Sequence, residues 1–263
     1  MLEINKIYLG CCLEIMKEID DKSIDLILCD LPYQVTARNS WDTIIPFDKL
    51  WARYERIIKD NGAVVLTATQ PFASQLVCFN LKLFKYEWIW QKSYITGVLN
   101  AKKQPVRNHE QILVFYKSQP TYNPQGLIPF NKTIRQGTSS SNYGIRNSNN
   151  EYFQENTNYP RTVQLISSKG EGKKIHPTQK PLELGEYLVK TYTNENDLVL
   201  DNATGSGTFC LAAQKLKRNF IGIEKNENFY NIAKKRIEDI NFCDICKDWT
   251  NHTSSNCGDN KGN

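Results

Sequence analysis

The chain has 263 residues, 40% of them hydrophobic, and a formal net charge of +5 at pH 7. This length and composition suit one sizeable α/β domain with an insertion. No apolar run approaches the ~20 residues of a membrane span and no signal-peptide pattern is present, so a cytoplasmic location is expected. The eight cysteines do not suggest a disulfide framework, because Cys29, Cys78 and Cys210 fall in apolar segments typical of reduced thiols.

Strand and helix patterns alternate over residues 6–116. Strands are predicted at 6–9, 24–29, 63–69, 86–90 and 111–116, and helices at 13–19 and 47–59, with another helix beginning at Pro71. The dipeptide Asn61-Gly62 is expected to mark the end of the second helix. The strand 24–29 is apolar except for Asp25, as is typical of a strand buried on both faces.

The periodicity fails over residues 118–172, where Asn, Ser, Thr and Gly dominate, especially at 138–150. We therefore predict an insertion or a partly disordered segment here, and not a part of the sheet. Between residues 101 and 175 there are 11 Lys or Arg against 4 Asp or Glu. This excess of positive charge indicates either a polyanionic partner or a solvated basic loop.

Regular alternation returns in the last third of the chain. Helices are predicted at 182–192, 208–216 and 228–237, and strands at 198–200 and 220–223, whereas the polar tail 242–263 is expected to be loose. Alternating strands and helices predict a doubly wound, mostly parallel α/β sheet.

Polar residues follow two of the predicted strands. The element Asp30-Leu31-Pro32-Tyr33 comes directly after the strand 24–29, and the stretch 198–208 reads LVLDNATGSGT, a strand followed by an acid and a Gly-rich turn. Open α/β sheets bind ligands at the carboxyl ends of their strands. Each element alone also fits a simpler interpretation, an ordinary turn in the first case and a tight connection to a helix in the second.

A third element, His176-Pro177-Thr178-Gln179-Lys180-Pro181, makes the combination specific. With these motifs the chain resembles the S-adenosyl-L-methionine-dependent DNA amino-methyltransferases of the β class, which modify adenine N6 or cytosine N4. The resemblance runs from about Lys6 to about Ile240, with further matches at 97–103, 109–117 and 220–224. It implies a Rossmann-like sheet, S-adenosyl-L-methionine as cofactor and double-stranded DNA as partner, and it leaves a homodimer and an associated restriction endonuclease open.

The resemblance also implies a division of the chain. Residues 1–118 and 175–241 would form the catalytic domain, with the target-base motif in the first part and the cofactor motif in the second. Residues 119–174 would be an inserted target-recognition region, followed by the tail 242–263. Within the insertion, Lys132, Arg135 and Arg146 are the candidate phosphate contacts.

The residues themselves support a cofactor site around the Gly-rich turn. Gly205 and Gly207 allow the backbone to approach a ligand closely, and the helix N-terminus after them suits the methionine carboxylate. Glu224 ends the next strand about 20 residues later, where a carboxylate accepts ribose hydroxyls in dinucleotide-type folds. A nicotinamide site is the alternative, although the third glycine of its motif is absent. An exposed acid near the start of the next helix is the simpler explanation of Glu224, with Asn226 competing for the cap.

By resemblance, the cofactor is lined by the residues of the Gly-rich turn and by three residues outside it, Glu224, Thr178 and Lys180. The residues of the turn are Asp201, Ala203, Thr204, Gly205, Ser206, Gly207 and Thr208, while Thr178 and Lys180 approach the methionine end. The chain departs from the family at two positions. Relatives often have an aromatic residue in place of Ala203 and an acid in place of Cys11.

The catalytic element is Asp30 to Tyr33. The Asp30 carboxylate and the Leu31 carbonyl would each accept one hydrogen of the target amino group, which localises its lone pair for attack on the methyl group. Pro32 would fix the carbonyl, and Tyr33 would stack on an extruded base unless it is only a packing aromatic. The family usually has proline at Leu31, and cytosine-directed relatives tend to have serine at Asp30, which favours adenine.

The remaining histidines and cysteines are not assigned to a functional site. His109 and His176 lie outside any ligand-spaced cluster and are interpreted as structural. The spacing of Cys243, Cys246, His252 and Cys257 is close to that of a zinc knuckle, but incidental cysteines in a polar tail explain it equally simply, so no metal site is assigned. Methylation of RNA or of a small-molecule amine, and a catalytically silent nucleic-acid-binding protein, remain the rival functions.

Overall fold

The computed structural model describes residues 2–33, 43–135, 151–167 and 179–239, and the backbone of 241–243 and 248–250. The chain divides into two compact units, one formed by Met1–Asn123 with Thr162–Asn263 and the other by Pro124–Arg161. None of the helices in these described ranges combines the length and apolar character needed to cross a membrane.

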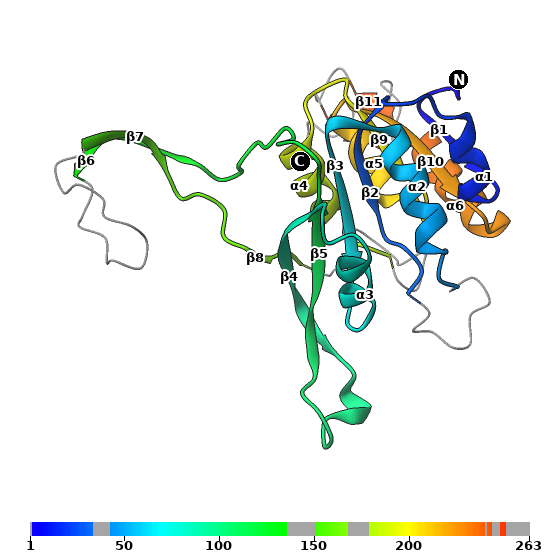
Figure 1. Cartoon of the computed structure of the whole chain (residues 1–263), viewed down its shortest axis with the longest axis horizontal. Coiled ribbons are helices and arrows are strands. Elements are labelled where there is room, and N and C mark those ends of the chain that lie inside the picture. The colour runs from blue at the N-terminus through cyan, green and yellow to red at the C-terminus, as the bar shows by residue number, and fades with distance from the viewer. Residues whose placement is uncertain are drawn as a thin grey trace, which may run out of the picture. The chain divides into compact units, whose positions relative to one another are not determined.

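The first unit is built on an eight-stranded sheet with the order β1-β10-β9-β2-β3-β5-β4-β8 (Figure 1). The strands β1, β10, β9, β2 and β3 run parallel, β5 is antiparallel to both β3 and β4, and β8 is parallel to β4. The prediction of a doubly wound, mostly parallel sheet is confirmed. The strands are β1 Lys6–Leu9, β2 Ile24–Cys29, β3 Ile58–Ala68, β4 Phe84–Thr96, β5 Arg107–Phe115, β8 Val163–Leu165, β9 Leu198–Asp201 and β10 Asn219–Glu224.

Helices cover both faces of the sheet. One hydrophobic core lies under α1 Cys12–Ile15, the 3-10 helix Met16–Glu18, α2 Phe47–Ile57 and α3 Phe72–Phe79, and the other under α4 Leu182–Tyr192, α5 Thr208–Lys215 and α6 Glu227–Glu238. Side chains alternate between the cores along β2, with Ile27 in the first and Leu26 and Leu28 in the second. Burial on both faces explains the apolar run from Leu26 to Cys29, while Asp25 near the start of the strand pairs with Lys59.

The strand order reverses between β2 and β9, which are neighbours through the pair Ile27↔Leu200. From β9 the chain passes through α5 to β10 on one side, and from β2 it passes through α2 to β3 on the other. Such a reversal opens a crevice outside the carboxyl ends of the two central strands, which is the usual ligand site of open α/β sheets. Asp30 and Asp201 lie at these two ends.

Several predicted boundaries were wrong. The helix predicted to reach Lys59 ends at Ile57, and β3 begins at Ile58, so Gly62 lies inside a strand and not at a helix end. A Cβ on Gly62 would lie 2.9 Å from the Asp25 carbonyl oxygen, so close strand packing requires glycine there. β4 continues beyond Trp90 into a hairpin with β5 whose end projects from the sheet (Figure 1).

The prediction that residues 118–172 lie outside the sheet was also wrong in part. The strand β8 adds three residues to the sheet edge, and β6 Ile128–Arg135 pairs with β7 Glu151–Thr157 as an antiparallel hairpin in the second unit. These strands are largely exposed and therefore carry no alternation of polar and apolar residues. In the tail, β11 Asn241–Cys243 pairs with β12 Asp248–Thr250, so these residues are not loose as predicted. Cys78 is exposed, whereas Cys29 and Cys210 are buried thiols.

Candidate active site

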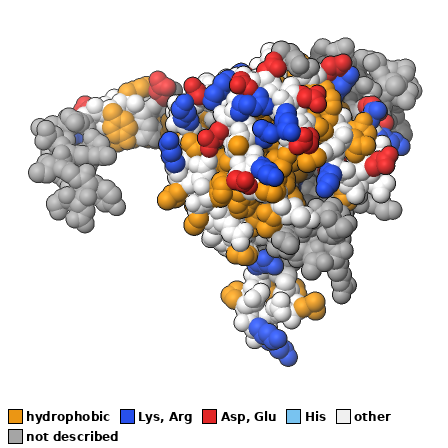
Figure 2. Space-filling view, turned by 45° about the vertical axis from the view of Figure 1, so that its right-hand side comes forward, with side chains coloured by type: hydrophobic (Ala, Val, Ile, Leu, Met, Phe, Trp, Pro, Cys, Tyr) orange, Lys and Arg blue, Asp and Glu red, His pale blue; other side chains and the backbone are white. Residues whose placement is uncertain are grey.

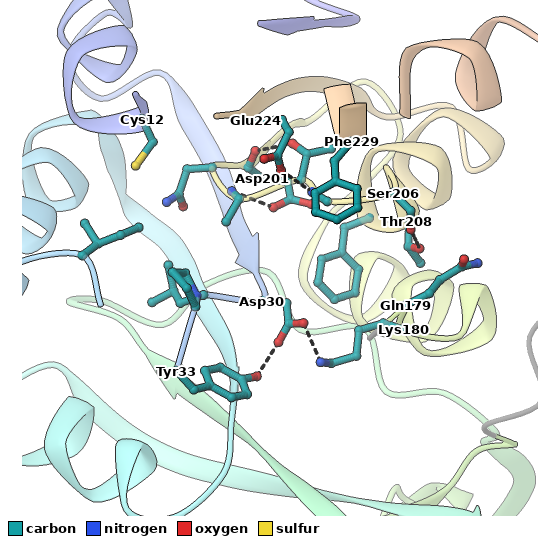
Figure 3. Close-up of a pocket in the computed structure, with 18 of the residues that line it drawn as sticks. Cys12, Asp30, Tyr33, Gln179, Lys180, Asp201, Ser206, Thr208, Glu224 and Phe229 are labelled. Carbon is teal, nitrogen blue, oxygen red and sulfur yellow. Dashed lines mark hydrogen bonds and ion pairs between the residues drawn. The ribbon is translucent and has the colours of Figure 1, made fainter. Parts of the chain in front are cut away.

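A cavity of about 830 Å³ lies at the carboxyl edge of the sheet, where the strand order reverses (Figure 3). Its walls come from segments far apart in the sequence. They include the residues that follow β2, the Gly-rich turn after β9, the end of β10 and the first turn of α6, and the stem of the β4–β5 hairpin. The fold therefore brings the predicted target-base element and the predicted cofactor turn to one cavity.

Asp30 is held by three donors at one end of the cavity. The hydroxyl groups of Tyr33 and Thr67 both donate to its Oδ1, and their oxygens lie 2.9 Å apart. The Lys180 ammonium donates to Oδ2 at 2.6 Å. Burial of the Tyr33 hydroxyl and the negative charge of Asp30 raise the tyrosine pKa well above its usual value, so Tyr33 stays a donor at neutral pH.

A chain of buried charges continues behind Asp30. Lys180 Nζ lies 3.3 Å from Glu110 Oε2, and Lys92 donates to Oε1 of the same carboxylate. Burial lowers the pKa of Lys180, but Asp30 and Glu110 outweigh it and the net shift is upward. For Glu110 burial acts upward, and the two lysines outweigh it and lower the pKa. A full positive charge therefore lies against Asp30.

Glu224 closes the Gly-rich turn at the opposite end of the cavity. Its Oε2 accepts a hydrogen bond from the Gly205 amide at 2.8 Å, and its Oε1 accepts one from the Asn226 amide at 2.7 Å. Burial raises the pKa of Glu224. Asn226 itself caps α6, since its side chain accepts from the amides of Asn228 and Phe229. Glu224 is thus a half-buried acid on the cavity wall, while the cap is Asn226.

The two glycines of the turn have different surroundings. Both have positive φ, +54° at Gly205 and +81° at Gly207. A Cβ on Gly205 would meet no atom within 4 Å, whereas one on Gly207 would lie 3.1 Å from the Ala233 Cβ on α6. Gly205 therefore keeps space free at the cavity, and Gly207 allows close helix packing.

Asp201 is a buried acid whose carboxylate has few hydrogen-bond donors around it. Only 2% of its surface is exposed, and its Oδ1 accepts a long hydrogen bond of 3.3 Å from the Ala203 amide. In the described part of the chain no ion pair joins it to a lysine or arginine. Burial raises its pKa to about 8. A positively charged ligand in the cavity would favour its ionised form.

The remaining predicted residues of the turn are placed as follows. Ala203 lines the cavity, and the buried Thr204 hydroxyl donates back to the carbonyls of Asp201 and Ile223, which ties the turn to its strands. Ser206 and Thr208 line the cavity and contact Arg236 of α6, whose Nη1 lies 3.0 Å from both the Ser206 carbonyl oxygen and the Thr208 hydroxyl.

Among the residues that the sequence did not predict are Phe229 and Asn202 on the cavity wall and Arg236 on α6. Phe229, in the first turn of α6, lies at the same end as Asp201 and Glu224 (Figure 3). It offers an aromatic face near a turn that has Ala203 where relatives have an aromatic, and its position after the Asn226 cap was the signal available. Arg236 and Asn202 carried no such signal. The Asn202 side-chain oxygen accepts a hydrogen bond from the Tyr54 hydroxyl at 2.6 Å.

Other predicted residues lie elsewhere or outside the described ranges. Lys180 contacts Asp30 and not the Gly-rich turn, while Leu31, Pro32 and Tyr33 line the cavity. Lys132 and Arg135 lie on β6 in the second unit, where Arg135 pairs with Glu151 at 2.8 Å. Among the described residues there is no group of three or more His, Cys, Asp or Glu suited to a metal. The residues outside the described ranges are Thr178, Arg146, His176, Cys246, His252 and Cys257, and for Cys243 only the backbone is described.

Comparison with known proteins decides the family. A family model described as DNA methylase, for enzymes of the N6 and N4 type, matches residues 24–235. The chain belongs to this family. It is 31% identical to the Type II methyltransferase M1.MboII of Moraxella bovis, over 89% of this chain and 96% of that protein. The match confirms the family predicted from the motifs, an enzyme class that methylates amino groups of DNA.

Solved structures agree with this assignment. The M1.HpyAVI complex with SAM is 28% identical, with a TM-score of 0.63 and coverage of 88% of this chain and 98% of that chain. The cytosine-N4-specific PvuII DNA methyltransferase has a TM-score of 0.65, with coverage of 91% and 92%, but only 15% identity. The second likeness shows a shared fold, which is the Rossmann-like methyltransferase fold that was predicted.

Proposed function

We propose that this DNA methyltransferase transfers a methyl group from S-adenosyl-L-methionine to N6 of adenine in duplex DNA. The observation that carries the proposal is the cavity at the strand reversal, with Asp30 at one end and the Gly205–Glu224 contact at the other. Adenine is favoured by an aspartate at position 30. It is also favoured by a relative, the DNA adenine methyltransferase YhdJ of Escherichia coli (strain K12), which is 29% identical over 90% of this chain.

The residues at the turn suit S-adenosyl-L-methionine, which supplies an activated methyl group when bound. Each Glu224 oxygen accepts one backbone amide and keeps a lone pair for a ribose hydroxyl. The N-terminus of α5 suits a carboxylate, and the buried Asp201 suits a cationic group. Phe229 offers a face for a flat ring. The absence of a third glycine and of a pyrophosphate-type loop argues against a nicotinamide.

The residues at the other end suit an amino group that is a poor nucleophile. The Tyr33 and Thr67 hydroxyls fix Oδ1 of Asp30, so Oδ2 keeps a defined direction for accepting an amino hydrogen. The Leu31 carbonyl oxygen would accept a hydrogen bond from the second hydrogen of the amino group. The nitrogen gains the methyl group as the sulfur–methyl bond breaks, and the Asp30 carboxylate stabilises the positive charge that develops on the nitrogen. The surplus amino proton then passes to water. No covalent bond to the protein is needed. The base must leave the duplex to reach this position.

The test is expression in a host without DNA methylation, followed by modification-sensitive sequencing and nucleoside analysis of the host DNA. We expect N6-methyladenine within one sequence motif, and none from the Asp30→Ala variant. N4-methylcytosine instead would overturn the choice of adenine. Methylated RNA with unmodified DNA would overturn DNA as the substrate.

The region 119–174 is proposed to recognise the target sequence, with Lys132, Arg135 and Arg146 at phosphates. Support comes from its positive charge and from Lys132 and Arg135 on a largely exposed hairpin. Replacing all three by alanine should flatten the salt dependence of DNA binding by about 0.9 per lost phosphate contact and leave cofactor affinity unchanged. A homodimer and a paired restriction endonuclease stay predictions, the latter motivated by relatives named Type II methyltransferases.

A further inference from the structure

The β4–β5 hairpin extends beyond the sheet at the edge that carries the active-site cavity (Figure 1). Because β5 is antiparallel to both β3 and β4, the end of β4 at Thr96 points to the same edge as the end of β2 at Cys29. The stem of the hairpin lines the cavity with Lys92, Arg107 and Glu110. The end of the hairpin therefore lies beyond the mouth of the cavity that holds Asp30.

This end, residues 94–103, exposes apolar side chains (Figure 2). Leu99 is 102% exposed, and no large hydrophobic side chain in the described residues is more exposed. Val98 and Ile95 are also more than half exposed, and Tyr94 is 43% exposed. Removing exposed leucine and valine side chains from water is favourable, so a cluster of this kind marks a surface that a partner covers.

The end of the hairpin has a defined backbone. Gly97 has φ +78°, a left-handed value that suits glycine. The short 3-10 helix Val98–Asn100 follows, and backbone bonds join the Asn100 amide to the Gly97 carbonyl at 3.0 Å and the Lys103 amide to the Asn100 carbonyl at 2.8 Å. A partner therefore meets a preformed apolar tip, which lowers the entropy cost of binding.

The charge around the tip identifies the class of partner. No Asp or Glu occurs between residues 91 and 109, whereas Lys102, Lys103 and Arg107 are exposed. An apolar tip within a wholly basic segment complements a polyanion with apolar surfaces between its charges, and stacked bases inside a phosphate backbone have that character. Apolar wedges that enter base steps are a known means of opening a duplex.

We propose that the tip of the β4–β5 hairpin enters duplex DNA beside the target base. Leu99 and Val98 occupy the space between base steps, and Lys102 and Lys103 neutralise neighbouring phosphates. Extruding a paired base costs a few kcal/mol of stacking and pairing, and the inserted side chains offset part of this cost. The inference rests on the proposed function, because it takes DNA as the substrate.

The test compares two duplexes that carry the methylation site found by sequencing. In one the target adenine is paired, and in the other it faces an abasic position, so that extrusion is already favoured. We expect Leu99→Ser to lower kcat/KM about tenfold or more on the paired duplex, which is the effect of 1.4 kcal/mol, and to approach wild-type activity on the abasic duplex. Leu81→Ser is the matched control, since Leu81 is 67% exposed but lies outside the hairpin, and should match the wild type on both.

Three outcomes would overturn the proposal. They are wild-type activity of Leu99→Ser on the paired duplex, an equal loss on both duplexes, and a change from dimer to monomer in light scattering, which would make the tip a contact between two copies. A wild-type enzyme that methylates neither duplex would instead reject the proposed function. In a second measurement, replacing Lys102 and Lys103 by glutamine should lower the salt slope of duplex binding by about 1.8. An unchanged slope would remove both lysines from the DNA interface and count against the proposal.

Discussion

Two aspartates mark the ends of the neighbouring strands β2 and β9, and their surroundings are opposite. Asp30 accepts hydrogen bonds from two hydroxyls and from the Lys180 ammonium, itself part of a chain of buried charges. Asp201 is more deeply buried, its hydrogen-bond partners are the Ala203 amide at 3.3 Å and the Cys29 thiol, and burial raises its pKa to about 8. At equivalent places in one sheet, Asp30 therefore has a lysine as ion-pair partner, whereas Asp201 has none among the described residues.

This difference separates the two tasks of the cavity. The protein itself supplies the charge that fixes Asp30, so this carboxylate is oriented before any substrate arrives. Asp201 lacks such a partner, so its ionisation depends on what enters the cavity. We infer that the Asp30 end is preorganised for the reacting amino group, while the Asp201 end responds to the binding of a cationic ligand.

The largest effect is expected for Asp30→Ala. Removing the acceptor for the amino hydrogen should lower the rate of methyl transfer by about 10³-fold or more, since single electrostatic groups at reacting centres contribute about 10²–10³. The measurement is single-turnover transfer of a labelled methyl group to duplex DNA. Asp60→Ala, at an exposed acid that pairs with Lys22 and Lys117, is the control and should keep wild-type rates. Turnover of Asp30→Ala within tenfold of wild type would refute the role of Asp30.

Lys180→Met should lower the free energy of unfolding, because it removes the ammonium group that pairs with the carboxylates of Asp30 and Glu110 in a buried site. Breaking a buried ion pair by removing one partner costs about 3–5 kcal/mol. The matched control is Lys117→Met, whose pair with Asp60 is exposed and should contribute less than about 1 kcal/mol. Urea unfolding of both variants measures the difference. Equal free energies of unfolding would show that the charges behind Asp30 are not coupled to the fold.

The two glycines of the turn provide a comparison within the cofactor end. Gly205→Val places a side chain in the open space at the cavity and should weaken S-adenosyl-L-methionine binding about 100-fold. Gly207→Val drives a side chain against Ala233 and should mainly lower the unfolding temperature. In both variants the valine has a left-handed backbone conformation, which lowers the free energy of unfolding by about 1–2 kcal/mol. This strain is therefore the same in the two variants and does not affect their comparison. Tight cofactor binding by Gly205→Val would make the turn merely structural.

Asp201 gives a smaller, pH-dependent effect. Between about pH 4 and pH 8 the folded protein keeps a proton that the unfolded chain has released, so the free energy of unfolding should fall as pH rises through this window. Asp201→Asn should remove that slope. A cationic ligand that binds the ionised form should release a proton near pH 7, which calorimetry in buffers of different ionisation enthalpy detects. Binding without proton release would show that Asp201 does not respond to the ligand.

The sequence predicted the bounds of strands well where both faces of the strand are buried. The bounds of β2 were predicted to the residue because five of the six residues from Ile24 to Cys29 are apolar and buried, Asp25 being the exception. β4 beyond Trp90 and the strands β6 to β8 were missed, because exposed strands lack the alternation that marks a half-buried one.

For the site, the motifs identified Asp30 and Lys180 separately, yet not their contact across 150 positions of sequence. The assignment of Lys180 to the methionine end of the cofactor stays a prediction beside its contact with Asp30. Glu110 was missed altogether, since its role depends on two lysines, Lys92 and Lys180, that only the folded chain brings together. Local patterns therefore predict which residues are unusual, and the fold determines which of them act together.

The most direct test of the division between the two ends is calorimetric titration of S-adenosyl-L-methionine into three proteins without DNA. We predict that Asp30→Ala binds with the wild-type Kd within about twofold, because Asp30 is assigned to the amino group alone. Glu224→Ala, with the fold checked by thermal unfolding, should bind about 100-fold more weakly, since two ribose hydroxyls lose a charged acceptor worth about 1.5–3 kcal/mol. Equal losses in the two variants, or wild-type affinity in Glu224→Ala, would contradict the account.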